Sequence, residues 1–347
     1  MAYSLAEIAV VALCPLLGKW LMTRDGWQRR LIGYRTTMKS VYPCSSSSGN
    51  LLADRRYEYA LALLARGDDH GAVELLRQAL ELAPGWAAAH FALGEILAKR
   101  GDMAQACAAL RAALVSDPAD HAGAGARLAV LRGETPDRLP TAHVRALFDG
   151  YAARFEDSLV GALNYQAPSL LVAAVEGAFP GRHFAAMLDL GCGTGLAARA
   201  FAGRVTAIDG IDLSPGMLGQ AHDSGLYRQL VAGDLTTLLQ TPKAAPLRPS
   251  YDLMIAADVF VYLGDLGPPF RAIFDRLAAG GVLGFTVQSH AGDGVILGAD
   301  YRFAHASTYL AHLARELGFM VLAARPAVTR QDRGVDVPGA LCLWAKA

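Results

Sequence analysis

The sequence predicts a protein in two parts: an all-helical repeat region, then an α/β domain with a doubly wound, mostly parallel sheet whose last strand is antiparallel. Three observations lead to this prediction. Small residues recur at a fixed interval near the N-terminus, and short apolar runs alternate with helix-like segments after residue 143. The last two apolar runs are separated only by a loop, which favours an antiparallel pair at the C-terminus.

Size and composition fit two domains and exclude several classes of protein. The chain has 347 residues, and 53% of them are hydrophobic, enough for one large core and one smaller core. Its formal net charge is zero, so it lacks the electrostatic footprint of a nucleic-acid-binding protein. The five cysteines have neither metal-ligand nor disulfide spacing, so we expect no metal site and a cytoplasmic location.

Residues 1–50 form an N-terminal extension to which we assign no domain. The apolar segment 5–22 is interrupted by a glutamate, a proline and a lysine, and its uncharged part is shorter than the roughly twenty residues that span a bilayer. Three alternatives remain: a weak membrane-surface anchor, a disordered extension, and an overlong gene model with the true start at Met22 or Met38. We favour the last two together and expect no membrane association.

Residues 51–131 contain two copies of a helical repeat. Alanines at matching positions would let two helices pack closely, a Gly-Asp pair would end one helix and open the next, and proline would stop the second helix. The recurring pairs, each 34 residues apart, are Gly67 and Gly101, Ala72 and Ala106, Ala79 and Ala113, and Pro84 and Pro118. Over residues 51–118 this pattern resembles the tetratricopeptide repeat family, and residues 121–131 read as a capping helix.

Two functions are open for the repeats. Stacked helix pairs usually present a concave face that binds a protein partner. Alternatively, two repeats and a cap serve only to pack on the next domain, because about three repeats are needed for independent stability. Residues 132–142, with two prolines and several charges, are expected to be a linker to the domain at 143–347.

The run LDLGCGTGLA, residues 188–197, connects a strand to a helix in this second domain. Gly191, Gly193 and Gly195 would allow the backbone to turn tightly and a ligand to approach closely. The free N–H groups at the start of the following helix suit a carboxylate or a phosphate. A glycine-rich turn alone is weak evidence for a cofactor site, so the acids that follow it matter.

Acids end the later strands, at the edge where sheets of this kind bind ligands. Asp212 ends the second strand, where an acid accepts hydrogen bonds from both ribose hydroxyls of a nucleoside cofactor. Asp234 ends the third strand and has the chemistry to accept from an adenine amine. Asp258 ends the fourth strand, near the expected reacting end of a cofactor. Asp189 lies inside the first strand and would order the glycine loop or meet the charged end of the cofactor.

These motifs together resemble the class I S-adenosylmethionine-dependent methyltransferases. DLGCGTG, DLSPGML, GD and DVFVYL occur in the family's order across residues 143–347. The resemblance implies a Rossmann-like sheet of seven strands with an antiparallel last strand, and S-adenosylmethionine as the cofactor. The whole chain is similar to bacterial predicted methyltransferases that carry tetratricopeptide repeats at the N-terminus.

The resemblance also implies which residues bind the cofactor. It places the loop glycines under the methionine part, Asp212 on the ribose, Asp234 near adenine and Asp258 by the methionine amine. Asp209 is a rival for the ribose contact, but Asp212 belongs to the matched string DLSPGML and is preferred. The full set is Tyr151, Asp189, Gly191, Cys192, Gly193, Gly195, Asp212, Leu213, Met217, Asp234, Leu235 and Asp258. Tyr151 would lie near a lid, and Phe155, on the same helix face, is equally a lid or a core residue.

The implied reaction is an in-line methyl transfer to a small-molecule or protein acceptor that the sequence does not identify. A general base is needed only if the acceptor is protonated. His305 is the candidate base, although a packing histidine fits its surroundings as well. Tyr262 would close the acceptor pocket, or it is a core residue. Tyr301 with Arg302 would hold an acidic substrate, or both belong to a solvated turn.

Other functions are less well supported. The spacing G-x-G-x-G is not the dinucleotide fingerprint, and no proton-relay pair follows, which argues against hydride transfer. No NPPY-like string follows the fourth strand, which argues against methylation of nucleic-acid amines. A protein-interaction adaptor, with repeats for docking and a non-catalytic cofactor domain, is the alternative that we retain.

Overall fold

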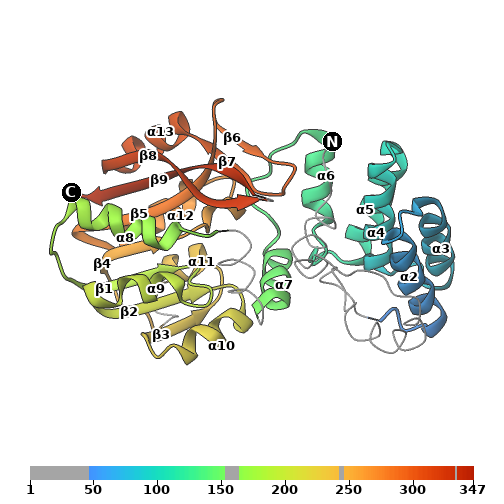
Figure 1. The fold of residues 1–347 in the computed structure, drawn as a ribbon, viewed down its shortest axis with the longest axis horizontal. Coiled ribbons are helices and arrows are strands. Elements are labelled where there is room, and N and C mark those ends of the chain that lie inside the picture. Colours follow the sequence, from blue (N-terminus) through green and yellow to red (C-terminus); the bar gives the residue numbers. More distant parts are fainter. Residues whose placement is uncertain (1–46, 153–163, 242–245, 333) are drawn as a thin grey trace, which may run out of the picture. The chain divides into compact units, whose positions relative to one another are not determined.

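The computed structural model describes residues 47–152, 164–241, 246–332 and 334–347. The chain divides into two compact units, with the boundary after Arg132. Figure 1 colours both units along the sequence, and each is described by itself below. The expected extension falls almost entirely outside the described residues, as does Phe155.

The first unit consists of antiparallel helix pairs, as the repeat pattern predicts. Ala72, Ala79 and Ala106 are fully buried where the helices pack, and Gly67 and Gly101 have positive φ angles of 81° and 85° after the helices that they follow. Positive φ is the backbone conformation that glycine adopts most easily, which explains its place in the repeat. The helices are α2 (Leu51–Leu64), α3 (Asp69–Leu82), α4 (Ala87–Lys99), α5 (Met103–Ser116) and α6 (Ala124–Arg132).

A buried ion pair fixes α6 against α4 within this unit. The Glu95 side chain is only 5% exposed, and its Oε1 lies 2.5 Å from Arg127 Nε. Burial raises the pKa of Glu95, while the Arg127 charge opposes this rise. Asp120 caps α6, because its carboxylate accepts from the N–H groups of Ala124 and Gly125 at 2.6 and 2.9 Å.

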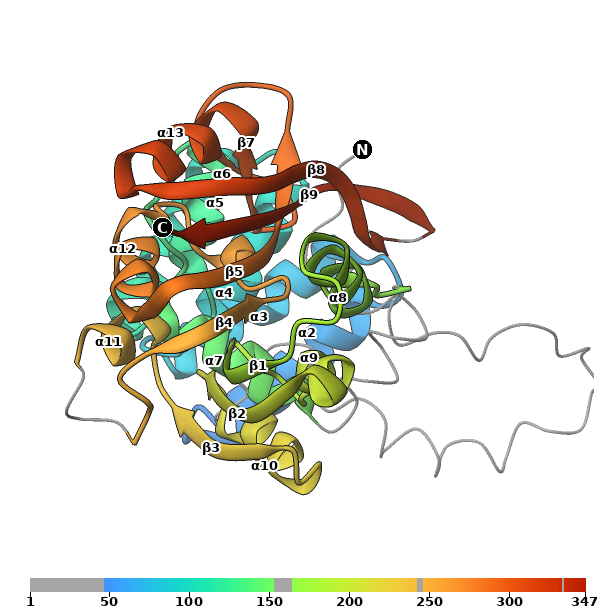
Figure 2. The same cartoon turned by 90° about the vertical axis from the view of Figure 1, so that its left-hand side faces the viewer.

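The second unit is built on one sheet, to which the described residues contribute nine strands. The order β3-β2-β1-β4-β5 is parallel throughout, and β9 is antiparallel to both β5 and β8 (Figure 2). The strands are β1 (Phe184–Leu190), β2 (Val205–Asp212), β3 (Tyr227–Ala232), β4 (Tyr251–Ala256), β5 (Leu277–His290), β6 (Val295–Leu297), β7 (Phe303–Ala306), β8 (Phe319–Asp332) and β9 (Val335–Lys346).

This topology confirms the predicted doubly wound sheet with an antiparallel end. The strands β3-β2-β1-β4-β5-β9-β8 are the seven that the sequence predicts. The short strands β6 and β7 are additional: β7 pairs with residues 288–290 at the end of β5, where only Gln288 also pairs with β9. Three- and four-residue strands are too short to give a periodic signal in a sequence.

Helices cover both faces of the sheet, with α8 and α9 on one side and α11, α12 and α13 on the other (Figure 2). Alternate residues of β4 enter the two cores: Leu253 and Ile255 one, Met254 and Ala256 the other. The helices are α7 (Thr141–Tyr151), α8 (Ala167–Ala178), α9 (Leu196–Phe201), α10 (Pro215–Asp223), α11 (Leu235–Gln240), α12 (Gly267–Arg276) and α13 (Ser307–Leu317). None of the helices in the described ranges has the length and apolar character that crossing a membrane requires.

Most of the linker predicted at residues 132–142 belongs to the second unit, which begins at Gly133. The Asp137 carbonyl accepts from Gly264 N–H at 2.7 Å, and Leu139 N–H donates to the Tyr262 carbonyl at 3.1 Å. The Leu139 side chain is buried, at 3% exposure. This segment therefore packs beside the loop that follows β4.

Candidate functional site

The glycine loop between β1 and α9 adopts a conformation that needs glycine. Gly191, Gly193 and Gly195 have φ angles of 62°, 53° and 93°. A Cβ atom at Gly191 would lie 2.6 Å from Val259 Cγ2, so this part of the loop also lies against the residues after β4. The sequence places glycine where both the backbone conformation and the close packing require it.

Asp212, the last residue of β2, is bonded to this loop. Its Oδ2 accepts from the Gly193 N–H at 2.9 Å, and its Oδ1 accepts from the Ser214 N–H at 2.8 Å. Burial raises the pKa of Asp212, while these two N–H donors oppose the rise. Each carboxylate oxygen can accept a further hydrogen bond, because two donors use only part of its capacity.

Asp189, on β1, lies beneath the same loop. Its side chain is 1% exposed, and its Oδ2 accepts from the Tyr227 hydroxyl at 2.7 Å. The Tyr227 ring packs on the loop, since a Cβ atom at Gly195 would lie 3.2 Å from it. Burial, above all, raises the pKa of Asp189 to about 7, and the nearby Asp212 charge adds to this rise.

Asp258, after β4, is held in a left-handed conformation, with φ of 56°. Thr286 Oγ1 accepts from its N–H and donates to its Oδ1, both at 2.9 Å. Thr329 Oγ1 donates to the same Oδ1 at 3.1 Å, and Arg330 Nε lies 3.7 Å from Oδ2. These contacts from β5 and β8 fix the carboxylate at the carboxyl end of β4.

Asp234, after β3, has partners that the sequence does not suggest. It caps α11 by accepting from the Thr237 N–H at 3.0 Å, and Arg138 pairs with its other oxygen. Burial raises the pKa of Asp234, but the Thr237 N–H and Arg138 outweigh this effect, so that the pKa is lowered. The carboxylate is therefore ionised and shared with the segment that precedes α7.

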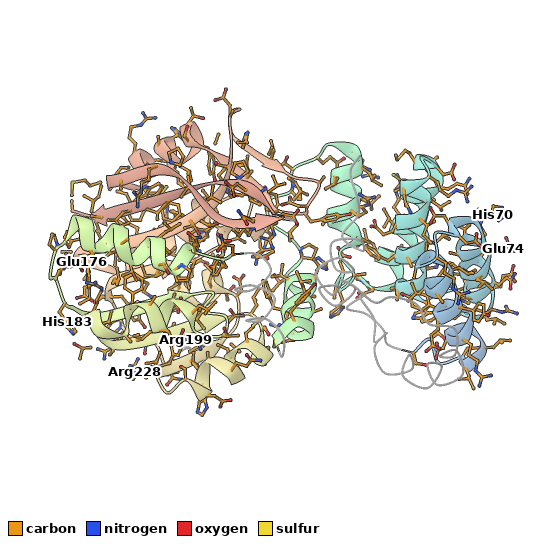
Figure 3. The ribbon with its side chains drawn as sticks, in the orientation of Figure 1. His70, Glu74, Glu176, His183, Arg199 and Arg228 are labelled. Carbon is orange, nitrogen blue, oxygen red and sulfur yellow. The ribbon has the colours of Figure 1, made fainter. Side chains whose placement is uncertain are left out.

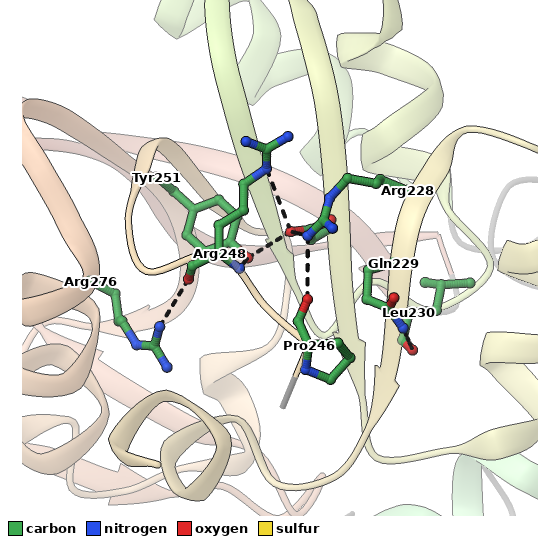
Figure 4. Close-up of polar contacts among 8 residues, drawn as sticks. Arg228, Gln229, Leu230, Pro246, Arg248, Tyr251 and Arg276 are labelled. Carbon is green, nitrogen blue, oxygen red and sulfur yellow. Dashed lines mark hydrogen bonds and ion pairs between the residues drawn. The ribbon is translucent and has the colours of Figure 1, made fainter. Parts of the chain in front are cut away.

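Asp209, the rival for the ribose contact, is engaged elsewhere, by the side chains of Arg228, Arg248 and Tyr251, which Figure 4 labels. Its side chain is 1% exposed, and its Oδ2 accepts from Arg228 Nη2 at 2.5 Å and from the Tyr251 hydroxyl at 2.8 Å. Arg248 Nε lies 4.0 Å from the same oxygen. This network ties β2 to β3 and β4 and favours Asp212 as the acid that faces a ligand.

We predict that Asp209→Asn lowers the free energy of unfolding by about 2 kcal/mol, because it replaces a buried charged acceptor of two hydrogen bonds with a neutral amide. Thermal melting of the full chain measures this loss. Asp223→Asn is the matched control, since Asp223 lies on the surface, with its side chain 83% exposed. Equal melting temperatures for the two variants would contradict the prediction.

A family model described as "Methyltransferase domain" matches residues 188–283, from the glycine loop to β5. The chain contains a methyltransferase domain. Two models described as "Tetratricopeptide repeat" match residues 53–96 and 87–120 in the first unit. The predicted resemblance is thereby confirmed for both parts of the chain.

Among curated proteins, the chain is 43% identical to methyltransferase-like protein 27 of Homo sapiens over 28% of this chain and 40% of that protein. It is 30% identical to the malonyl-[acyl-carrier protein] O-methyltransferase of Acetivibrio thermocellus over 30% of this chain and 36% of that one. The chain thus spans less than half the length of either relative. A solved S-adenosylmethionine-dependent methyltransferase from Clostridium acetobutylicum has 17% identity and a TM-score of 0.44, over 57% of this chain and 98% of that one.

His305 is not placed to act as a base in the methyltransferase domain. It lies on β7 with no exposed surface, and its Nε2 is 3.0 Å from the Leu263 carbonyl. Burial lowers the pKa of His305 to about 4, so the imidazole is neutral at physiological pH. An imidazole enclosed in this way cannot reach an acceptor, and its contact with the Tyr309 ring is typical of a packing histidine.

Three other predicted residues are buried or partly buried. Cys192 is buried, and burial raises the pKa of its thiol, which argues against a nucleophile. Met217, on α10, is fully buried, and Leu235, on α11, packs partly buried against the core. In the described parts of the chain, no group of three or more histidine, cysteine or acidic side chains is arranged to hold a metal ion.

Tyr151 is the last residue of α7, and this helix docks on the start of α10. The Asp149 carboxylate accepts from Ser214 Oγ at 2.5 Å, and Arg145 Nε donates to the carbonyl of Leu213, another predicted residue, at 3.1 Å. Tyr151 itself is half-buried. The helix is therefore next to the residues that follow Asp212.

Sequence reasoning missed a polar cluster from the C-terminal half of the methyltransferase domain. Arg330, on β8, is only 6% exposed, and its Nη2 donates to Gln288 Oε1 at 2.9 Å. Tyr165, before α8, is half-buried, and its pKa is raised by burial and by Asp258 and Asp189. The one signal in the sequence is the polar Thr-Arg pair inside an otherwise apolar last hairpin.

The opposite end of the sheet carries different chemistry. His183 immediately precedes β1, and Glu176, near the end of α8, pairs with Arg204 (Figure 3). His183 Nε2 lies 3.1 Å from Thr206 Oγ1 and is exposed. These are contacts among surface side chains, whereas the buried acids gather at the carboxyl ends of the strands.

Proposed function

We propose that the methyltransferase domain binds S-adenosylmethionine and transfers its methyl group to an acceptor. The observation that carries this proposal is the Asp212 carboxylate, bonded to the glycine loop at Gly193 with hydrogen-bonding capacity left on both oxygens. A carboxylate in this position suits the two hydroxyls of a ribose.

The residues around the loop fit this cofactor. Gly191 allows the loop to lie directly against Val259, because a Cβ there would be 2.6 Å from Val259 Cγ2. Thr194 Oγ1 is buried in the loop and has no hydrogen-bond partner among the described residues. S-adenosylmethionine carries a net positive charge, which the surrounding carboxylates of Asp189 and Asp258 would balance. When bound, it supplies a methyl group on an activated sulfonium.

Within this proposal, each side chain has a role in binding or orientation. Asp212 would hold the ribose and Asp258 the methionine amine, with Thr286 and Thr329 fixing the Asp258 carboxylate. Asp234 with Leu235 would lie by the adenine, and Tyr151 near a lid. The acceptor is a small molecule or a protein, as the malonyl-[acyl-carrier protein] named in one relative illustrates for that enzyme.

Calorimetric titration of the full chain tests the cofactor. We expect S-adenosylmethionine and S-adenosylhomocysteine to bind and NADH to give no heat, because the loop spacing differs from the dinucleotide fingerprint. No binding of either sulfur compound to the folded protein would overturn the proposal. It would make the repeat-based adaptor the leading function.

The affinity for S-adenosylmethionine should depend on pH through Asp189. Its pKa of about 7 means that the carboxyl is mostly ionised above that value and protonated below it. A cationic ligand favours the ionised form, so binding should weaken roughly tenfold from about pH 8 to about pH 6. Calorimetry at several pH values checks this, and Asp189→Asn should flatten the profile. A wild-type affinity independent of pH would count against the prediction.

A further inference from the structure

Two arginines lie beside Asp258 and contribute charge that the proposed cofactor contacts do not use. Arg330 is held by Gln288 at 2.9 Å, and its Nη2 lies 3.8 Å from the Asp300 carboxylate. Arg302 precedes β7, and its guanidinium lies 5.7 Å from the centre of the Tyr262 ring. Arg302 is thus close to an aromatic face, and Arg330 to carboxylates.

The guanidinium of Arg302 has N–H donors available for a ligand. In the part of the chain that the structure describes, it makes no hydrogen bond and no ion pair with another side chain. Burial lowers its pKa, but Tyr262 and the charges of Asp258 and Asp300 outweigh this, so the pKa of Arg302 is raised. An arginine carries five N–H donors in a planar fork that matches a carboxylate.

This charge borders the proposed cofactor site. Burial raises the pKa of Tyr165, with Asp258, Asp189 and Tyr262 adding to the rise and Arg302 opposing it, so all four groups are within electrostatic range of its hydroxyl. Asp258 is in turn 3.7 Å from Arg330. A ligand group beside Tyr165 would therefore be close to both arginines and to the carboxylate assigned to the methionine amine.

We propose that Arg302, backed by Arg330, forms a subsite for a carboxylate of the methyl acceptor; this inference rests on the proposed function. Arg330 is paired with Asp258 and Asp300, and the charges of Asp258, Asp300 and Asp332 act on Arg302. Among the described residues, Arg302 donates no side-chain hydrogen bond to these carboxylates, so its N–H donors remain for an acceptor carboxylate. The positive sulfonium of the cofactor would also attract that anion, so the two ligands favour each other's binding.

The histidines near the subsite agree with an acceptor that is already ionised. His305 is enclosed, and both ring nitrogens of His290 are used: Nδ1 accepts from the Gly292 N–H at 3.2 Å and Nε2 faces the Gly294 carbonyl at 3.3 Å. Transfer to a carboxylate oxygen forms one O–C bond as the C–S bond breaks, its electron pair remaining on sulfur. The products are a methyl ester and a neutral thioether, and no proton has to be removed.

Calorimetry on the full chain saturated with S-adenosylmethionine tests the subsite, with succinate as the probe and the neutral succinamide as its matched control. We expect succinate to bind and succinamide not to bind. Arg302→Gln should weaken succinate binding at least tenfold, while Arg302→Lys keeps part of it. Arg325→Gln should bind as wild type, because Arg325 is an exposed arginine on the same strand as Arg330.

The outcomes separate this inference from the proposed function. S-adenosylmethionine binding, measured first, tests the function, and Arg302→Gln should keep it within about threefold of wild type. If S-adenosylmethionine binds but succinate does not, or if Arg302→Gln binds succinate as wild type does, the subsite is wrong. Circular dichroism of the variants establishes whether they are folded. If Arg302→Gln is unfolded, the binding of succinate to Arg302→Lys and the comparison of succinate with succinamide test the subsite instead.

Discussion

Asp212→Ala is expected to weaken S-adenosylmethionine binding by more than tenfold, the largest effect that we predict at the site. The substitution removes a charged acceptor for the ribose hydroxyls and also the bond that holds the Gly193 N–H at 2.9 Å. Losing the hydrogen bonds between the ribose hydroxyls and this buried, charged carboxylate should cost about 2–4 kcal/mol of binding free energy. Titration calorimetry measures the change directly.

Two further variants make this experiment specific. Asp212→Asn keeps the size of the side chain but loses its charge, so it should fall between wild type and alanine. Asp223→Ala, an exposed acid on α10, should bind as wild type. An Asp212→Ala protein that is folded and binds with unchanged affinity would remove Asp212 from the cofactor site.

Glu95→Ala is expected to destabilise the first unit by about 3–5 kcal/mol, because it leaves Arg127 charged and only slightly exposed without its carboxylate partner. The Glu95 side chain is 5% exposed, so little water can replace the lost contact. Thermal melting of the full chain, followed by helical circular dichroism, gives the size of the change. Hydrogen exchange locates it, with α4 and α6 expected to lose protection first.

The control is Glu81→Ala, an exposed glutamate on α3, which should melt as wild type. Replacing both Glu95 and Arg127 by leucine should recover much of the loss, because an apolar pair avoids the cost of an isolated buried charge. Equal stability of Glu95→Ala and Glu81→Ala would mean that the ion pair does not hold α6.

The features that the sequence predicts well are local. Gly67 and Gly101 act within a single turn each, so their spacing predicts the repeat without knowledge of the rest of the chain. Gly193 and Asp212 are at the carboxyl ends of neighbouring parallel strands, and such ends meet at one edge of a sheet. The structure brings these two residues together for that reason.

The features that the sequence does not predict depend on contacts between distant segments. Arg330 meets Asp258 only because the last hairpin folds back along β5. His305 lies between two alanines, which do not specify whether it is buried, and its burial results from β7 packing under the loop after β4. Neither arrangement leaves a periodic pattern or a fixed spacing in the amino-acid order.

The pairing of residues 137–139 with the loop after β4 sets where the chain tolerates a change in length. An added residue at Gly133, which is exposed, displaces no contact that we describe. One added between Asp137 and Thr141 would shift the backbone bonds to Tyr262 and Gly264 and the Arg138 pair with Asp234 out of register. In an evolving lineage, repeats can therefore be gained or exchanged ahead of Gly133, while the eight residues that follow it must be inherited with the methyltransferase domain.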